Sequence, residues 1–129
     1  MFKRFLRLAV YVPAMAATGE PEKTFESTSA VHTLLSVFRQ FDFVGKVGTY
    51  KTVVEISNGT ETFAPTMNSR PTYGAANVAS TVPSVKLVTY MPAGTHSAEV
   101  DRMIAEVVLA HPWEHPVIEL NPVYLWMPS

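Results

Sequence analysis

The feature that most constrains the fold of this chain is an approximate internal repeat. Residues 7–13 (RLAVYVP) are similar to residues 86–92 (KLVTYMP), and each copy is a basic residue, an apolar run and then Tyr-x-Pro. Each copy is followed by an amphipathic helical pattern and then by another strand pattern. Two β-α-β units in tandem predict a ferredoxin-like α+β fold, in which two helices cover one face of an antiparallel sheet.

Both helices are predicted from apolar residues spaced i, i+3, i+4 and i+7. The first covers residues 29–40. The second has Ser97 as its N-cap and ends before Pro112, because the residue before a proline avoids helical dihedral angles. The two apolar stripes are Val31, Leu34, Leu35 and Phe38 in the first helix, and Val100, Met103, Ile104 and Val107 in the second.

Four longer apolar runs predict strands over residues 5–12, 49–57, 85–91 and 117–126. The first is expected to be central in the sheet, because bulky side chains occupy both of its alternating faces. The last contains Pro122, which lacks an N–H donor for the ladder and therefore predicts an edge position or a bulge.

One turn and two loops complete the predicted architecture. Asn58-Gly59 fits a type I′ hairpin turn, which would lead into a short returning strand over residues 60–63. Residues 14–28 and 66–84 are rich in small and polar residues and are expected to be loops. We expect the whole chain, residues 1–129, to form a single domain.

Composition narrows the classes of partner. With 10 basic and 11 acidic residues the net charge is −1, which gives no electrostatic reason to expect a nucleic acid or an anionic membrane. Low net charge also favours self-association. The chain has no cysteine and no apolar run of about 18 residues, so we expect a cytoplasmic protein without disulfides, thiolate metal sites or membrane spans. The N-terminus has basic residues followed by an apolar run, which is the pattern of a signal peptide. This run is short and interrupted by Pro13, so we do not expect a signal peptide here.

The densest group of chemically competent side chains is residues 111–115 (HPWEH). This segment formally matches the H-x-x-E-H zinc-protease pattern, but Pro112 and Pro116 exclude the regular helix that this chemistry needs. Two interpretations remain. His111, Glu114 and His115 form a looser metal site, or the segment is a structural junction. In the junction, His111 caps the second helix, Trp113 packs on the sheet, and Glu114 and His115 are solvated.

Two other groups of residues have open interpretations. Residues 45–48 (GKVG) are similar to a phosphate-binding turn, but they match neither the P-loop nor the dinucleotide fingerprint and lead into a strand. Trp113, Tyr124 and Trp126 form either a binding platform or a core or subunit contact. The sequence assigns no catalytic residue and no cofactor.

Several motifs occur in the order seen in a known family. Residues 11–13 (YVP), 45–50 (GKVGTY), 62–65 (TFAP) and 110–114 (AHPWE) resemble the CutA/PII-like domain of Nif-three-like proteins, in its free-standing form. The resemblance covers nearly the whole chain, and His-Pro-aromatic-Glu is its most specific element. The chain departs from the family pattern by Lys46 and Val47 in place of Arg-Ile, Trp113 in place of Tyr, and His115 in place of the second Glu.

This resemblance implies a homo-oligomer, with a trimer favoured, whose ligand clefts lie between subunits and whose long loop corresponds to residues 58–84. It places a small-molecule or metal ligand near Lys46, Gly48, Tyr50, His111, Trp113 and Glu114. The function expected is a non-enzymatic small-ligand-binding or regulatory module. One alternative is a metal protein or small enzyme centred on His111, Glu114 and His115. Another is a structural interaction domain with an apolar patch around Tyr124 and Trp126.

Overall fold

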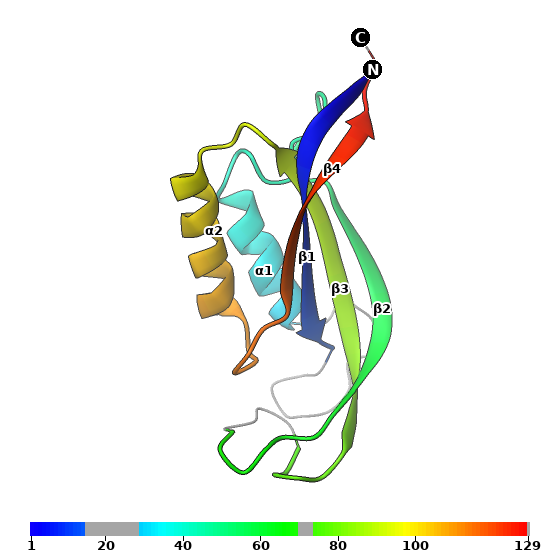
Figure 1. The fold of residues 1–129 in the computed structure, drawn as a ribbon, viewed down its shortest axis with the longest axis vertical. Helices are drawn as coiled ribbons and strands as arrows, with labels where there is room; N and C mark the ends of the chain where they lie inside the picture. Colours follow the sequence, from blue (N-terminus) through cyan, green and yellow to red (C-terminus); the bar gives the residue numbers. More distant parts are fainter. Residues whose placement is uncertain (15–28, 70–73, 129) are drawn as a thin grey trace.

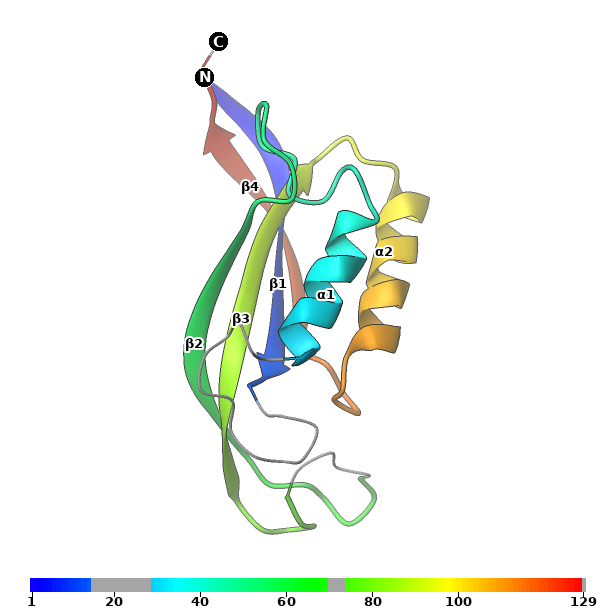
Figure 2. The same ribbon diagram turned by 180° about the vertical axis from the view of Figure 1, so that it is seen from behind.

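The computed structural model describes residues 1–14, 29–69 and 74–128. The four strands form one antiparallel sheet in the order β2-β3-β1-β4. Both helices lie on the same face of this sheet (Figures 1 and 2). The elements in chain order are β1 (Phe2–Pro13), α1 (Ser29–Arg39), β2 (Val54–Phe63), β3 (Ser80–Pro92), α2 (Ser97–Ala110) and β4 (Ile118–Trp126). The predicted ferredoxin-like α+β fold is confirmed.

The two copies of the repeat lie side by side in the centre of the sheet. β1 and β3 are antiparallel neighbours, with Arg7 opposite Tyr90 and Tyr11 opposite Lys86. The basic residue of each copy therefore faces the tyrosine of the other copy. Because side chains alternate along a strand, all four residues point to the same face of the sheet. That face carries no helix, since the intervening Leu8 points into the core on the opposite face.

The core lies between the sheet and the two helices. Both predicted helical stripes point into it, with Leu35 and Ile104 only partly buried. Full burial of a large apolar side chain contributes about 1.5–3 kcal/mol, so this one layer supplies most of the hydrophobic stabilisation. Its largest fully buried side chains include Phe38, Leu8, Leu34, Leu87, Met91 and Met103.

The hairpin turn predicted at Asn58-Gly59 is wrong. Both residues lie inside β2, where Asn58 pairs with Val85 and Gly59 with Ser84. β3 begins at Ser80, five residues before the predicted start, so Thr60–Phe63 continue one long strand instead of returning along a new one. Asn-Gly permits a tight turn without requiring one, and the extended partner strand determines the outcome.

Other boundaries also differ from the prediction. β2 begins at Val54 instead of residue 49, because Val47 and Tyr50 pair across a tight turn and Thr52 adopts a positive φ angle that interrupts an extended chain. The predicted loop over residues 66–84 ends before Ser80. Of the predicted loop over residues 14–28, only residue 14 lies within the described residues. β4 is an edge strand, as Pro122 predicted.

Both ends of α2 are capped by histidines. The N-cap of α2 is His96 rather than the predicted Ser97, and the His96 Nδ1 atom accepts a hydrogen bond of 3.1 Å from the Ala98 N–H. The C-cap is His111, in agreement with the stop predicted from Pro112. Within the described part of the chain, neither helix has the length and apolar character that crossing a membrane requires.

Candidate functional site

His111 joins the end of α2 to the end of β1. Its Nε2 atom bonds the carbonyl oxygen of Tyr11 at 2.5 Å, and its Nδ1 atom accepts a 3.0 Å hydrogen bond from the Trp113 N–H. A carbonyl oxygen can only accept, so Nε2 must carry the proton and Nδ1 must be unprotonated. His111 is therefore held as the neutral Nε2–H tautomer, with both ring nitrogens occupied.

The surroundings of His111 also favour its neutral form. The side chain is buried, and this desolvation lowers the pKa of His111, while the hydrogen bond to the Tyr11 carbonyl acts in the opposite direction and only partly offsets it. The Trp113 ring packs against the imidazole with 5.3 Å between ring centroids. These contacts describe a structural junction, which is one of the two interpretations that the sequence left open.

The metal-site interpretation finds no converging ligands in this segment. Glu114 and His115 are exposed, whereas His111 is buried and already uses both ring nitrogens. No group of three His, Cys, Asp or Glu side chains in residues 1–14, 29–69 and 74–128 is arranged to hold a metal ion. His111, Glu114 and His115 therefore do not form a ligand set in this structure.

The second predicted group, Lys46, Gly48 and Tyr50, lies in a tight turn between α1 and β2. Its residues 47 and 50 exchange backbone hydrogen bonds of 3.0 Å. All three residues are exposed, and Tyr50 has an exposed fraction of 75%. The turn is anchored by the Gly45 N–H, which donates to the Tyr90 carbonyl at 2.7 Å.

The two predicted groups lie at opposite ends of the sheet within one chain. The turn is tied to Tyr90, which is opposite Arg7, whereas His111 is tied to Tyr11, four residues further along β1. Four strand residues span about 13 Å. Figure 1 shows the same separation, with the segment after α2 and the turn before β2 at different ends of the molecule. A single chain does not combine them into one site.

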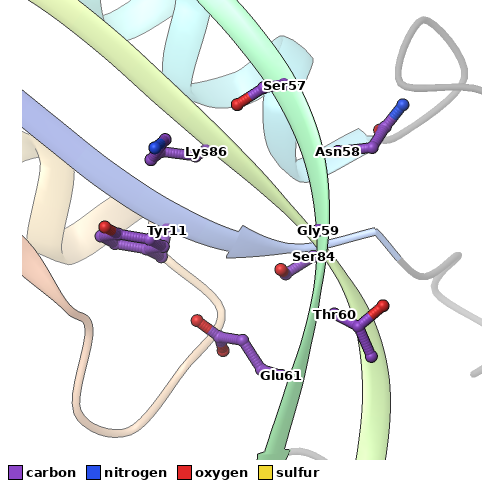
Figure 3. Close-up of a pocket in the computed structure, with 8 residues that line it drawn as sticks. All are labelled: Tyr11, Ser57, Asn58, Gly59, Thr60, Glu61, Ser84 and Lys86. Atoms are coloured by element: carbon purple, nitrogen blue, oxygen red, sulfur yellow. The ribbon is translucent and has the colours of Figure 1, made fainter.

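The structure instead presents a polar hollow on the helix-free face of the sheet. It has a volume of about 190 Å³ and opens to solvent. Its side chains come from three neighbouring strands, and those of Tyr11, Ser57, Glu61, Ser84 and Lys86 point to the same side of the sheet (Figure 3). We call this feature the sheet-face hollow. Its lining residues are Tyr11, Ser57, Asn58, Gly59, Thr60, Glu61, Ser84 and Lys86.

The register of the strands explains why a hollow forms here. Gly59 of β2 is opposite Ser84 of β3, so this row of the sheet carries one side chain fewer than its neighbours. The rows on either side carry the long Lys86 and Glu61 side chains. A Cβ atom added to Gly59 would lie 3.3 Å from the Ser84 Oγ atom. The small residues of this row form the floor, and the charged residues form the rim.

The rim of the hollow is electrostatically mixed. A hydrogen bond to the Glu119 carboxylate raises the pKa of Tyr11 above its ordinary value, and burial and the negative charges of Glu119 and Glu61 act in the same direction. Arg7 acts in the opposite direction. Burial also raises the pKa of the Glu61 carboxyl. Charges of both signs thus surround the Tyr11 hydroxyl.

Sequence reasoning missed this site although one signal pointed to it. The repeat contains a basic residue and a tyrosine four positions apart, and the antiparallel register of the two copies places each basic residue opposite the other copy's tyrosine. The contribution of Gly59 and Glu61 was hidden, because the Asn58-Gly59 pair had been interpreted as a turn.

A solved structure with a similar fold is the crystal structure of a Bacillus cereus protein related to NIF3. The match covers 95% of this chain with a TM-score of 0.65 and 19% sequence identity. This chain spans only 26% of the length of that protein. A scan of family models and a search of curated proteins find no match. The comparison therefore supports the fold alone.

Proposed function

We propose that this chain is a non-catalytic module that binds a small polar ligand in the sheet-face hollow and acts as a regulatory domain of the CutA/PII-like kind. The observation that carries the proposal is the hollow itself, with Lys86, Glu61 and Tyr11 around a floor of small residues. Binding pockets typically combine a preformed concave surface with a few convergent polar groups. The fold shared with a protein related to NIF3 supports the Nif-three-like part of this proposal by analogy of fold.

The hollow is placed where ligand binding can be transmitted. β2 and β3 continue past it, from Glu61 to Phe63 and back from Ser80 to Val82, before the connecting segment begins. A ligand that contacts both strands would alter the direction of this projecting β2–β3 ribbon. The ribbon is therefore the element through which we expect ligand binding to be communicated to a partner.

Thermal unfolding with a panel of small polar metabolites tests the proposed function. Amino acids, carboxylic acids, sugars, nucleosides and nucleotides are each added to the wild-type protein. A compound that binds only the folded state raises Tm. We expect at least one class to do so, and we expect Gly59→Leu, which fills the hollow, to abolish the shift.

Gly94→Leu is the matched control, because Gly94 is exposed and a Cβ there meets no atom within 4 Å. This variant should keep the ligand-induced shift. If no compound raises Tm in the wild type, or if Gly59→Leu keeps the whole shift, the sheet-face hollow is not the binding site.

A second candidate, a structural interaction domain, is favoured by a separate observation. Where β1 and β4 extend past the helices (Figure 1), three large apolar side chains on one face are between 63% and 67% exposed. We call them the terminal strip; they are Phe2, Tyr124 and Trp126. Exposed apolar patches commonly mark contacts with other proteins. We propose that the strip takes part in self-association, with the trimer implied by the family resemblance as the favoured state.

The alternative of a metal protein or small enzyme centred on His111 has weaker support. His111 would have to lose its bonds to Tyr11 or Trp113 before either ring nitrogen could bind a metal. The predicted ligand residues Lys46, Gly48 and Tyr50 retain a role only if an oligomer brings that turn to another subunit.

A further inference from the structure

The charges around the sheet-face hollow restrict the ligand that it can accept. Lys86 and Glu61 flank the Gly59–Ser84 pair on opposite sides, each two residues along its strand. Their rows are four residues apart, or about 13 Å along the strands, and the two side chains of opposite charge extend from the same side of the sheet on either side of a floor of small residues. The hollow has a cationic end and an anionic end.

Neither end is neutralised by an ion pair in the described part of the chain. The salt bridge found there joins Arg102 to Glu99 on the exposed surface of α2, far from the hollow in sequence and on the other side of the sheet. Lys86 and Glu61 are both partly exposed and point to the same side as the hollow opens. Their charges are therefore available to a ligand.

The balance of charge excludes two simpler classes of ligand. A polyanion would meet the carboxylates of Glu61 and Glu119, which lie close enough to affect the Tyr11 hydroxyl. A simple cation would meet Lys86, and Arg7 beyond it. Like charges at such distances are repulsive, whereas a ligand with one charge of each sign satisfies both ends.

The volume of the sheet-face hollow also favours a small ligand. Pockets for drug-sized ligands have volumes of about 300–1,000 Å³. The sheet-face hollow, at about 190 Å³, is smaller. It fits a small molecule that has a short carbon backbone with a polar group at each end. The Tyr11 ring lies beside the hollow as an aromatic wall.

We propose that the sheet-face hollow recognises a small zwitterion of the free amino acid class, with its carboxylate toward Lys86 and its ammonium group toward Glu61. This inference rests on the proposed function, since it names the ligand class for the same hollow. Ser57 lies opposite Lys86 in the register and supplies a hydroxyl at the carboxylate end. The two ends together give both charge selection and a single ligand orientation.

Isothermal titration calorimetry on the full chain tests this inference with named probes. Each of the twenty L-amino acids is titrated, and L-alanine is compared with propionate, which lacks the ammonium group, and with ethylamine, which lacks the carboxylate. We expect at least one amino acid to bind, and L-alanine to bind about tenfold or more tightly than either fragment, because each fragment leaves one charged end of the hollow unmatched.

Two variants test which end of the hollow binds the carboxylate and which binds the ammonium group. Lys86→Met should weaken amino acid binding about tenfold or more and remove the preference for L-alanine over ethylamine. Glu61→Gln should weaken binding similarly and remove the preference for L-alanine over propionate. Lys51→Met and Glu106→Gln are the controls, because both residues are exposed and outside the hollow, and neither substitution should change affinity.

The outcomes separate this inference from the proposed function. Propionate or ethylamine binding as tightly as L-alanine would show an anion or cation site and overturn the zwitterion assignment. The zwitterion assignment also fails if no amino acid binds but another compound raises Tm and Gly59→Leu abolishes that shift. The proposed function survives this second result, because the hollow still binds a ligand. If nothing binds at the hollow, both fail.

Discussion

At the scale of single residues, His111 is positioned by two hydrogen bonds that hold β1, α2 and the segment before β4 together. Replacing it by alanine leaves the Tyr11 carbonyl and the Trp113 N–H without partners and opens a space where the ring was buried. An unsatisfied buried polar group costs about 1–3 kcal/mol. We therefore expect His111→Ala to lower the free energy of unfolding by about 2–4 kcal/mol in urea denaturation.

His115→Ala is the matched control, because His115 is exposed in the same segment. Exposed substitutions usually change stability by less than about 0.5 kcal/mol. Equal effects of the two substitutions would contradict the structural role of His111.

Protonation of His111 should destabilise the fold. Burial lowers its folded-state pKa below the unfolded value of about 6.5. Above pH 6.5 both states are neutral and the contribution of His111 is complete. As the pH falls from there toward the folded-state pKa, the unfolded state binds the proton first, and stability declines by up to about 1.4 kcal/mol per pH unit.

Urea denaturation measured at several pH values below 7 checks this dependence. His111→Gln should have a shallower decline than the wild type, and His115→Gln should have the wild-type slope. A wild-type slope in His111→Gln would show that another group causes the acid sensitivity.

At the scale of secondary structure elements, two glycines test the assignment of β2. Gly59 has ordinary strand geometry, and an added Cβ meets only the Ser84 Oγ atom, so Gly59→Ala should change stability by less than about 1 kcal/mol. Gly45 has φ of 72°, and an added Cβ would lie 2.4 Å from the Val53 backbone nitrogen. Gly45→Ala should therefore cost more than about 2 kcal/mol in thermal or urea unfolding.

Gly48→Ala is an intermediate control, since Gly48 has φ of 58° but open space around it, and about 1 kcal/mol is expected. The opposite order, with Gly59→Ala far more damaging than Gly45→Ala, would indicate that Gly59 occupies a tight turn and that β2 ends there.

These elements also show which parts of the fold could be predicted from sequence. The helices were predicted nearly to the residue, because the apolar stripes of Val31 to Phe38 and Val100 to Val107 are local patterns with one buried face. The register of β2 was not predicted. Asn58-Gly59 is compatible with both a turn and a strand, and only its pairing with β3 decides between them. The sheet-face hollow depends on that register and was therefore missed.

At the scale of the whole molecule, the terminal strip predicts how copies associate. Phe2 is opposite Trp126 in the register and both are more than 60% exposed, so the strip presents an apolar surface beside Arg4, which is opposite Tyr124 on the same face. We expect light scattering coupled to size exclusion to give a trimer for the wild type. Trp126→Glu should shift it toward the monomer, because a charge would be buried at the contact.

Tyr50→Glu provides a comparison, because Tyr50 is also exposed but lies in the turn before β2, outside the strip. This variant should keep the wild-type mass. A monomeric wild type, or dissociation by Tyr50→Glu and not by Trp126→Glu, would contradict association through the terminal strip.

The central claim is that ligand binding takes place on the helix-free face of the sheet and not at the His111 segment or the turn before β2. The most direct test is a ¹H–¹⁵N chemical shift titration with the compound that raises Tm most. We predict the largest shifts at the amides of Gly59, Ser84 and Lys86, in the floor and rim of the hollow. Largest shifts at His111 to His115 or at Lys46 to Tyr50, with the hollow unchanged, would contradict it.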